Sequence, residues 1–118
     1  VSPGGGPPSH LHRREDESFY LQQGTLTLKA GGKTIHASPG DFVHIPRGTV
    51  HSFRNTGTGE VKMLVTATPA GMEKFFEEAF YPAVEGSTPP LVTPALMQRI
   101  MAAAARNGME LLPQASQA

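Results

Sequence analysis

Two histidines separated by a single residue, His10 and His12, are the first side chains in this 118-residue sequence whose spacing suggests chemistry. On an extended strand, alternate side chains share a face, and two residues advance the chain by about 6.6 Å. Two imidazoles at that spacing can converge on one point, and neutral imidazole is the commonest protein ligand for divalent transition metals. Alone, however, a His-x-His pair is more typical of a solvated loop, so the interpretation depends on further ligands.

Two later residues supply candidates. Glu17 would share a strand face with Phe19 and Leu21, where a carboxylate is unfavourable unless it is paired or bound to a cation. His51 follows a turn signal, Pro46-Arg47-Gly48, and begins a new extended stretch. The two segments together therefore offer three imidazoles and one carboxylate.

The spacing of these residues resembles the two signature motifs of the cupin superfamily. The first motif is Gly, five residues, His-x-His, three or four residues, Glu, six residues and Gly, and it is matched by Gly4, His10, His12, Glu17 and Gly24. The second is Gly, five residues, Pro-x-Gly, two residues, His, three residues and Asn, matched by Gly40, Pro46, Gly48, His51 and Asn55. Ten positions matching in order are far more specific than either motif alone. The run Arg13-Arg14-Glu15-Asp16-Glu17 is similar to that of small single-domain bacterial cupins of the quercetin-dioxygenase-like branch.

The resemblance implies a mainly β fold, the double-stranded β-helix or cupin jelly-roll barrel. It also implies that His10, His12, Glu17 and His51 bind one divalent transition metal, with Glu17 acting both as ligand and as catalytic base. Mixed nitrogen and oxygen ligands without sulfur suit Fe, Mn, Ni, Cu or Zn, and affinity alone does not choose among them.

The function implied by this resemblance is that of an oxygen-dependent dioxygenase acting on an enolic or flavonol-like small molecule. Two other classes stay open. One is a non-catalytic metal-binding or small-molecule-binding sensor, because binding a metal does not prove turnover. The other is a sugar or keto-acid isomerase, a further activity found among cupins.

Composition excludes several functions. Ten basic residues balance ten acidic ones, so no charge footprint points to nucleic acid or to an acidic membrane surface. Cysteine is absent, which excludes disulfides and thiolate chemistry. There is no apolar run of about 18 residues and no signal peptide at the start, so we expect a cytoplasmic protein.

Short apolar runs separated by turn signals predict successive strands over 19–22, 25–30, 33–36, 42–45, 51–54 and 61–66. Gly31-Gly32 is typical of a two-residue hairpin. From Thr68-Pro69 the apolar period changes to that of a helix, and Thr93-Pro94 predicts a second helix up to about Asn107. We therefore expect a barrel over 1–67, a helical extension packed on it over 68–113 with a short strand at 109–112, and a frayed tail over 114–118.

The Gly/Pro-rich segment 1–9 stands where one or two strands usually precede the first motif in similar cupins. Because Val1 is not an initiator methionine, we expect that the upstream strands are missing from this sequence. An exposed sheet edge is normally covered or paired with another chain, so we expect a homodimer.

The remaining polar candidates are given structural roles. Glu15 is too close to His12 for the motif, and we interpret Arg13, Arg14, Glu15 and Asp16 as a solvated charged cluster. His36 is interpreted as a surface or turn residue. His44 is interpreted as a hydrogen-bonded structural residue, or as a contact to a metal ligand or to the substrate if its strand face points inward. Phe19, Leu21, Phe42 and Phe53 are expected to line either the barrel core or an aromatic substrate.

Overall fold

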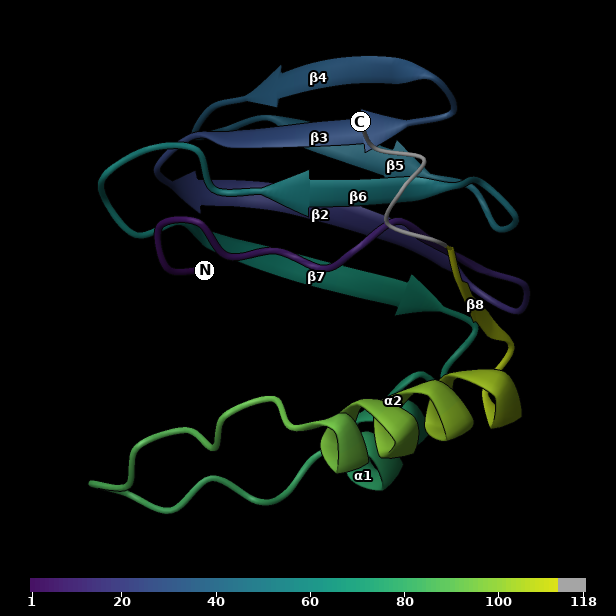
Figure 1. Ribbon diagram of the computed structural model, residues 1–118. Coiled ribbons are helices and arrows are strands. Elements are labelled where there is room, and N and C mark those ends of the chain that lie inside the picture. Colours follow the sequence, from purple (N-terminus) through teal and green to yellow (C-terminus); the bar gives the residue numbers. More distant parts are fainter. Residues whose placement is uncertain (113–118) are drawn as a thin grey trace.

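Two facing antiparallel sheets build the upper part of the molecule in Figure 1, and a pair of helices lies below them. The computed structural model describes residues 1–112. The larger sheet has the order β4 (Lys33–Ala37), β3 (Leu26–Ala30), β6 (His51–Arg54), β1 (His10–His12) and β8 (Met109–Leu111). The smaller sheet has the order β5 (Phe42–Ile45), β2 (Asp16–Gln23) and β7 (Lys62–Thr68).

Alternation along the strands creates the barrel core. In β3, Leu26 and Leu28 are buried, whereas Thr27 and Lys29 point away from the core. In β2, the buried face carries Glu17, Phe19 and Leu21, so the carboxylate shares its face with apolar side chains as predicted. The core contains eight buried apolar residues: Phe19, Leu21, Leu26, Leu28, Ala37, Val43, Ile45 and Val61.

Turn residues fix the register of the strands. Gly31 and Gly32 connect β3 to β4, with Ala30 opposite Lys33, which confirms the predicted hairpin. Asn55 is fully buried and its side chain donates to the carbonyls of Val1 and Gly59 and accepts from Gly57 N–H. This amide therefore ties the N-terminal segment to the connection between β6 and β7. The mainly β architecture with two C-terminal helices is confirmed.

The predicted start of the first helix is wrong. α1 runs over Glu73–Ala79, and Thr68 still belongs to β7, where it lies opposite Asp16 of β2. The local capping pattern of Thr68-Pro69 is overridden because strand pairing continues to Thr68.

The predicted start of the second helix is confirmed. α2 runs over Pro94–Arg106, with Pro94 in its first turn and the hydroxyl of Thr93 accepting a hydrogen bond from Leu96 N–H at 3.1 Å. The two helices pack on each other through Phe75, Ala79, Ala103 and Ala104, which form a second core. The helices are connected to the barrel through β8, which pairs with β1 along His10, Leu11 and His12. The predicted short C-terminal strand is therefore confirmed.

Two further expectations concern membrane-spanning helices and the C-terminal tail. Neither helix within residues 1–112 combines the length and the apolar composition needed to cross a bilayer. The expected tail, residues 114–118, lies outside the described residues.

Homodimer formation stays a prediction, and the smaller sheet offers a surface for it. Phe42, Tyr20 and Leu64 lie opposite one another on β5, β2 and β7 and are exposed, forming an apolar row on the outer face. Exposed contiguous apolar groups are typical of interaction surfaces. We expect light scattering to give a dimeric mass for the wild-type chain and a lower mass for Phe42→Glu and Leu64→Glu. A monomeric wild-type mass at all concentrations would contradict this expectation.

Candidate metal centre

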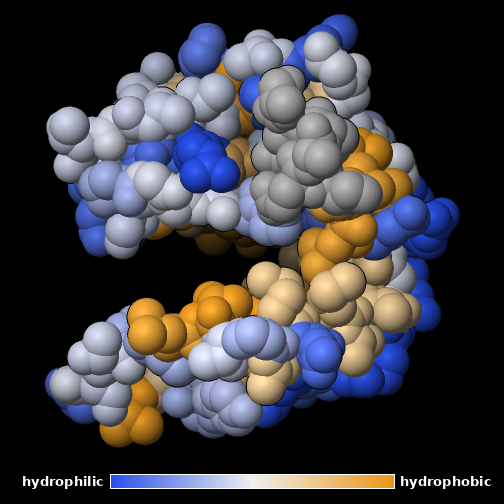
Figure 2. Space-filling model, in the orientation of Figure 1, coloured by the Kyte–Doolittle hydropathy of each residue, from blue (hydrophilic) through white to orange (hydrophobic). Residues whose placement is uncertain are grey.

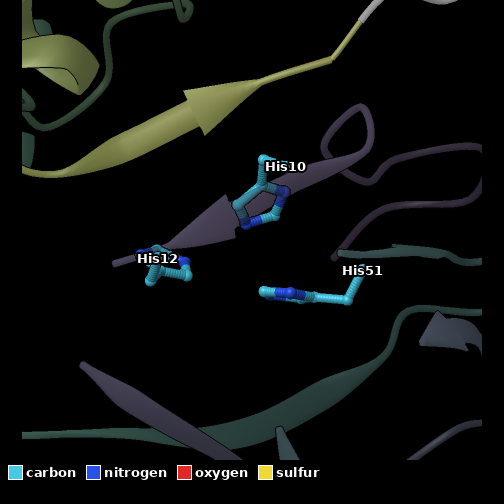
Figure 3. Close-up of side chains that lie close together, drawn as sticks. All are labelled: His10, His12 and His51. Atoms are coloured by element: carbon cyan, nitrogen blue, oxygen red, sulfur yellow. The ribbon is translucent and has the colours of Figure 1, made fainter. Parts of the chain in front are cut away.

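Three imidazoles meet inside the barrel. His10 and His12 point to the same side of β1 because they are alternate residues of one strand, and both are buried. His51, the first residue of β6, is the pairing partner of His10 in the neighbouring strand. The three rings converge, with ring centroids 4.3 to 5.5 Å apart (Figure 3). One nitrogen from each ring lies within 4.8 Å of the others, a cluster able to bind a metal ion.

Backbone carbonyls fix the orientation of two of these rings. His10 Nδ1 lies 2.9 Å from the carbonyl oxygen of Pro8, and His51 Nδ1 lies 2.8 Å from that of Thr49. A carbonyl oxygen only accepts hydrogen bonds, so each Nδ1 carries the hydrogen. In the neutral ring, Nε2 then presents its lone pair, which is the form that binds a metal.

The turn before β6 holds this geometry. Gly48 N–H donates to the carbonyl of His12 at 2.7 Å, which fastens the turn to the end of β1. Gly48 has φ of +80°, a conformation that favours glycine. The same turn presents the Thr49 carbonyl to His51. The Pro-x-Gly element of the motif therefore positions a ligand as well as reversing the chain.

Glu17 approaches the imidazoles from the opposite sheet. Its carboxylate oxygens lie 3.3 Å from Nε2 of His12 and 3.3 Å from Nε2 of His51. Its side chain is 4% exposed, so water contributes little to its solvation. The structure thus brings together all four of the residues that the resemblance implied. That Glu17 is a ligand and a base stays a prediction.

The arrangement fits a bound cation. In neutral His51, the Nε2 lone pair faces a carboxylate oxygen of Glu17, and two lone pairs at this distance repel unless a proton or a metal ion lies between them. Both ring nitrogens of His12 are buried and have no hydrogen-bond partner within residues 1–112. Buried polar atoms without partners are rare and call for an explanation, of which an unplaced ion is one.

Burial keeps the imidazoles in the form that binds metal. Desolvation lowers the pKa of His10 to about 4, although its hydrogen bond to Pro8 acts in the opposite direction. Desolvation also lowers the pKa of His12, against the attraction of the Glu17 carboxylate. Both rings are therefore neutral near pH 7, with lone pairs free for a cation.

A large apolar pocket opens onto the site. It has a volume of about 790 Å³ and lies between the barrel and the two helices, where Figure 2 shows the molecule hollowed. His10 and Glu17 are among its lining residues. The remaining wall is mainly apolar and includes Phe19, Phe53, Val65, Ala67, Phe75, Phe76, Phe80, Met97 and Ile100. No lysine or arginine of the described chain lines it.

One charged residue was misassigned from the sequence. Arg13 and Arg14 are exposed as expected, and Asp16 accepts hydrogen bonds from Arg47, whose guanidinium lowers the pKa of that carboxyl. Glu15, however, is only 6% exposed and lies beside His12, so its assignment to a solvated cluster is wrong. The sequence of adjacent charged residues does not indicate which of their side chains the loop buries.

The other candidates lie away from the imidazoles. His44 is exposed on the outer face of β5, where its Nδ1 lies 3.0 Å from the hydroxyl of Ser18, so the structural interpretation is confirmed. His36 is also exposed, as expected. Phe42 is 66% exposed and lines neither the core nor the pocket, so that expectation is wrong. Phe19 and Phe53 do line the pocket, and Leu21 belongs to the core.

Comparison with known proteins identifies the family. Residues 1–67 match the model of the cupin domain, which is more than half of the chain. The protein belongs to the cupin superfamily, and its two-sheet barrel is the double-stranded β-helix that the resemblance implied.

Two proteins of similar sequence have names that denote oxidation reactions. Quercetin 2,3-dioxygenase of Bacillus subtilis is 39% identical over 67 residues, covering 57% of this chain and 20% of that protein. Oxidoreductase iacF of Pestalotiopsis fici is 47% identical over 49 residues, covering 41% of this chain and 24% of that protein. The chain thus spans about a fifth to a quarter of these two relatives, and it resembles the quercetin-dioxygenase-like branch.

One of the solved structures with a similar fold has a name that denotes a different activity. A sugar phosphate isomerase of the cupin superfamily from Silicibacter pomeroyi superposes with a TM-score of 0.55 at 27% identity. The match covers 59% of this chain and 46% of that chain. The fold is therefore shared by proteins of different named activity, and the pocket must be used to choose among them.

The lowered pKa of His10 predicts how stability depends on pH. In metal-free protein between about pH 6.5 and 4, His10 binds a proton in the unfolded state but not in the folded state. The free energy of unfolding therefore falls as the pH falls through this range, and it stops falling below about pH 4. The effect is on the order of 3 kcal/mol. We expect urea unfolding of a His10→Gln variant to depend less steeply on pH than unfolding of the wild type or of His36→Gln. Equal slopes for all three proteins would contradict the burial effect.

Proposed function

We propose that this protein is a metal-dependent oxidoreductase that uses dioxygen to cleave an enolic or flavonol-like small molecule. One observation carries the proposal: three buried imidazoles and a buried carboxylate converge, and two of these four side chains, His10 and Glu17, line a large apolar pocket. The named activity of the Bacillus subtilis relative supports the reaction class.

His10, His12 and His51, together with Glu17, would hold the metal. A divalent transition metal at this point supplies Lewis acidity and, where it is redox-active, electron transfer between substrate and dioxygen. Neutral imidazoles add no positive charge of their own, and the Glu17 carboxylate adds a negative charge that favours a dication.

Glu17 has a second role in the proposal. One of its oxygens takes the proton from the acidic hydroxyl of an enolic substrate, which leaves the substrate as an electron-rich anion. Glu17 lines the pocket and is almost fully buried, so its carboxylate is itself largely shielded from bulk water. Dioxygen is the second substrate, and both of its atoms enter the product.

The pocket favours an uncharged, mainly apolar substrate over a sugar phosphate. Apart from His10 and Glu17, the ionisable lining residue of the described chain is Glu73, whose carboxylate accepts from Gly71 N–H. A phosphate group would meet two carboxylates and no cationic side chain of the described residues, which is unfavourable unless the metal itself binds the phosphate. Aromatic walls from both the barrel and α1 suit a planar ring.

The catalytic role is tested with Glu17→Gln. We expect protein loaded separately with Fe, Mn, Ni, Cu or Zn to consume oxygen with a flavonol or a β-diketone for at least one metal. The Gln variant should lose about 10² to 10⁴ in kcat, because an amide cannot take up the substrate proton. Oxygen uptake is measured with an electrode, and metal content is measured in parallel. Metal binding without oxygen uptake for any of these metals would favour the sensor alternative.

The location of the substrate is tested with Ala67→Phe. Ala67 lies opposite Glu17 on β7 and lines the pocket without contributing a polar side chain. A phenyl group there would fill the space beside Glu17, so we expect kcat/KM to fall at least about tenfold while metal affinity is unchanged. Thr66→Phe on the outer face of β7 is the matched control. Unaltered kcat/KM in Ala67→Phe would place the substrate elsewhere.

A further inference from the structure

His12 lies between two buried carboxylates. Its Nε2 is 3.3 Å from an oxygen of Glu17, and its Nδ1 is 3.8 Å from an oxygen of Glu15. A neutral imidazole carries one hydrogen, so one of its nitrogens must face a carboxylate with a bare lone pair. A metal ion on the Nε2 side resolves this conflict only if the hydrogen resides on Nδ1, facing Glu15.

We propose that Glu15 is a positioning residue of the metal centre, which accepts the Nδ1 hydrogen of His12 and so holds Nε2 toward the metal. The inference rests on the proposed metal site. Glu15 does not reach the metal position in this role. It acts through the tautomer and ring orientation of His12.

Comparison of the three histidines supports this role. His10 and His51 each have a backbone carbonyl at Nδ1, from Pro8 and Thr49. At Nδ1 of His12 the neighbouring group is the Glu15 carboxylate. The distance of 3.8 Å is longer than a hydrogen bond, so the inference requires the two groups to move closer together when a metal binds. Each ring nitrogen that faces away from the centre is thus matched to an oxygen, and metal-ligating histidines commonly have such a partner.

The surroundings of Glu15 offer no competing explanation for its burial. Its side chain is 7% exposed, and desolvation raises the pKa of this carboxyl. Arg47, which is near enough to act on it, forms its hydrogen bonds with Asp16. Arg14, the other nearby cation, donates to the carbonyl of Arg106. Within residues 1–112, the basic side-chain nitrogen within reach of the Glu15 carboxylate is Nδ1 of the neutral His12 ring.

The carboxylate also contributes charge. A carboxylate acceptor makes the ring a stronger donor to the metal than a neutral carbonyl does, because negative charge at Nδ1–H increases the basicity of Nε2. His12 would therefore be the most strongly binding of the three imidazoles. Unlike the two carbonyl partners, the carboxylate can be removed by substitution.

The test measures binding of Co²⁺ alone to chelator-treated protein, by competition with a chromophoric chelator. We compare wild type with Glu15→Leu, which removes the acceptor, and Glu15→Gln, which keeps an acceptor oxygen without the charge. We expect Co²⁺ affinity to fall about 10- to 100-fold in Glu15→Leu and less in Glu15→Gln. Asp16→Asn is the matched control, since it removes a neighbouring negative charge that pairs with Arg47, and its affinity should equal that of wild type.

A spectroscopic measurement separates positioning from general stability. Loaded with Cu²⁺, Glu15→Leu should show an altered electron paramagnetic resonance spectrum, whereas Asp16→Asn should not. Circular dichroism of the metal-free variants controls for folding. Should the Leu variant fail to fold, the Gln variant decides, with a several-fold loss of affinity expected.

The outcomes are distinct. If wild-type protein binds no Co²⁺, the metal site fails and with it both the proposed function and this inference. If wild type binds Co²⁺ and the folded Glu15 variants bind it equally well with the same spectrum, the positioning role is overturned while the metal site stands. Equal losses in Asp16→Asn and Glu15→Leu would assign the effect to overall charge, which also overturns the inference.

Discussion

The structure depends on keeping a set of polar groups buried in a small apolar barrel. Three imidazoles and the carboxylates of Glu15 and Glu17 are each less than one-tenth exposed. Removing charged groups from water is unfavourable by several kcal/mol per ion, unless they are paired or bind a cation. Their arrangement meets this requirement, because the Nδ1 atoms of the three imidazoles face oxygens, and the nitrogens on the other side of the rings converge on one point. The strands, the turn before β6 and the loop after β1 all serve to bring these groups together.

Much of this architecture could be predicted from the sequence, because short strands with period-two alternation and glycine-rich turns have strong local signals. The four candidate metal-binding residues were found from motif spacing, since strand alternation places His10 and His12 on one face. The burial of Glu15 could not be predicted, because it depends on the path of the loop after β1, which is hydrogen-bonded to the turn before β6. Phe42 was misassigned because both faces of β5 carry apolar residues, and only pairing with β2 decides which face is inward. The predicted start of α1 is wrong for a related reason. Thr68 suits the cap of a helix, but it pairs with Asp16 of β2, and the sequence around Thr68 does not reveal this pairing.

The two parts of the pocket differ in their relation to known proteins. The region that matches the cupin domain, residues 1–67, contains all four candidate metal-binding residues. The facing wall is built from α1 and α2, which lie beyond that match. The candidate metal site can therefore be compared with the cupin relatives, whereas the helical wall of the pocket lies outside the matched region.

The position of β8 links these two parts mechanically. This strand continues directly from the helical pair and is hydrogen-bonded to β1, the strand that carries His10 and His12. The helices cannot swing far from the barrel without pulling on that strand. A displacement of the helices that widened the pocket would therefore be transmitted to the strand that carries two of the candidate ligands.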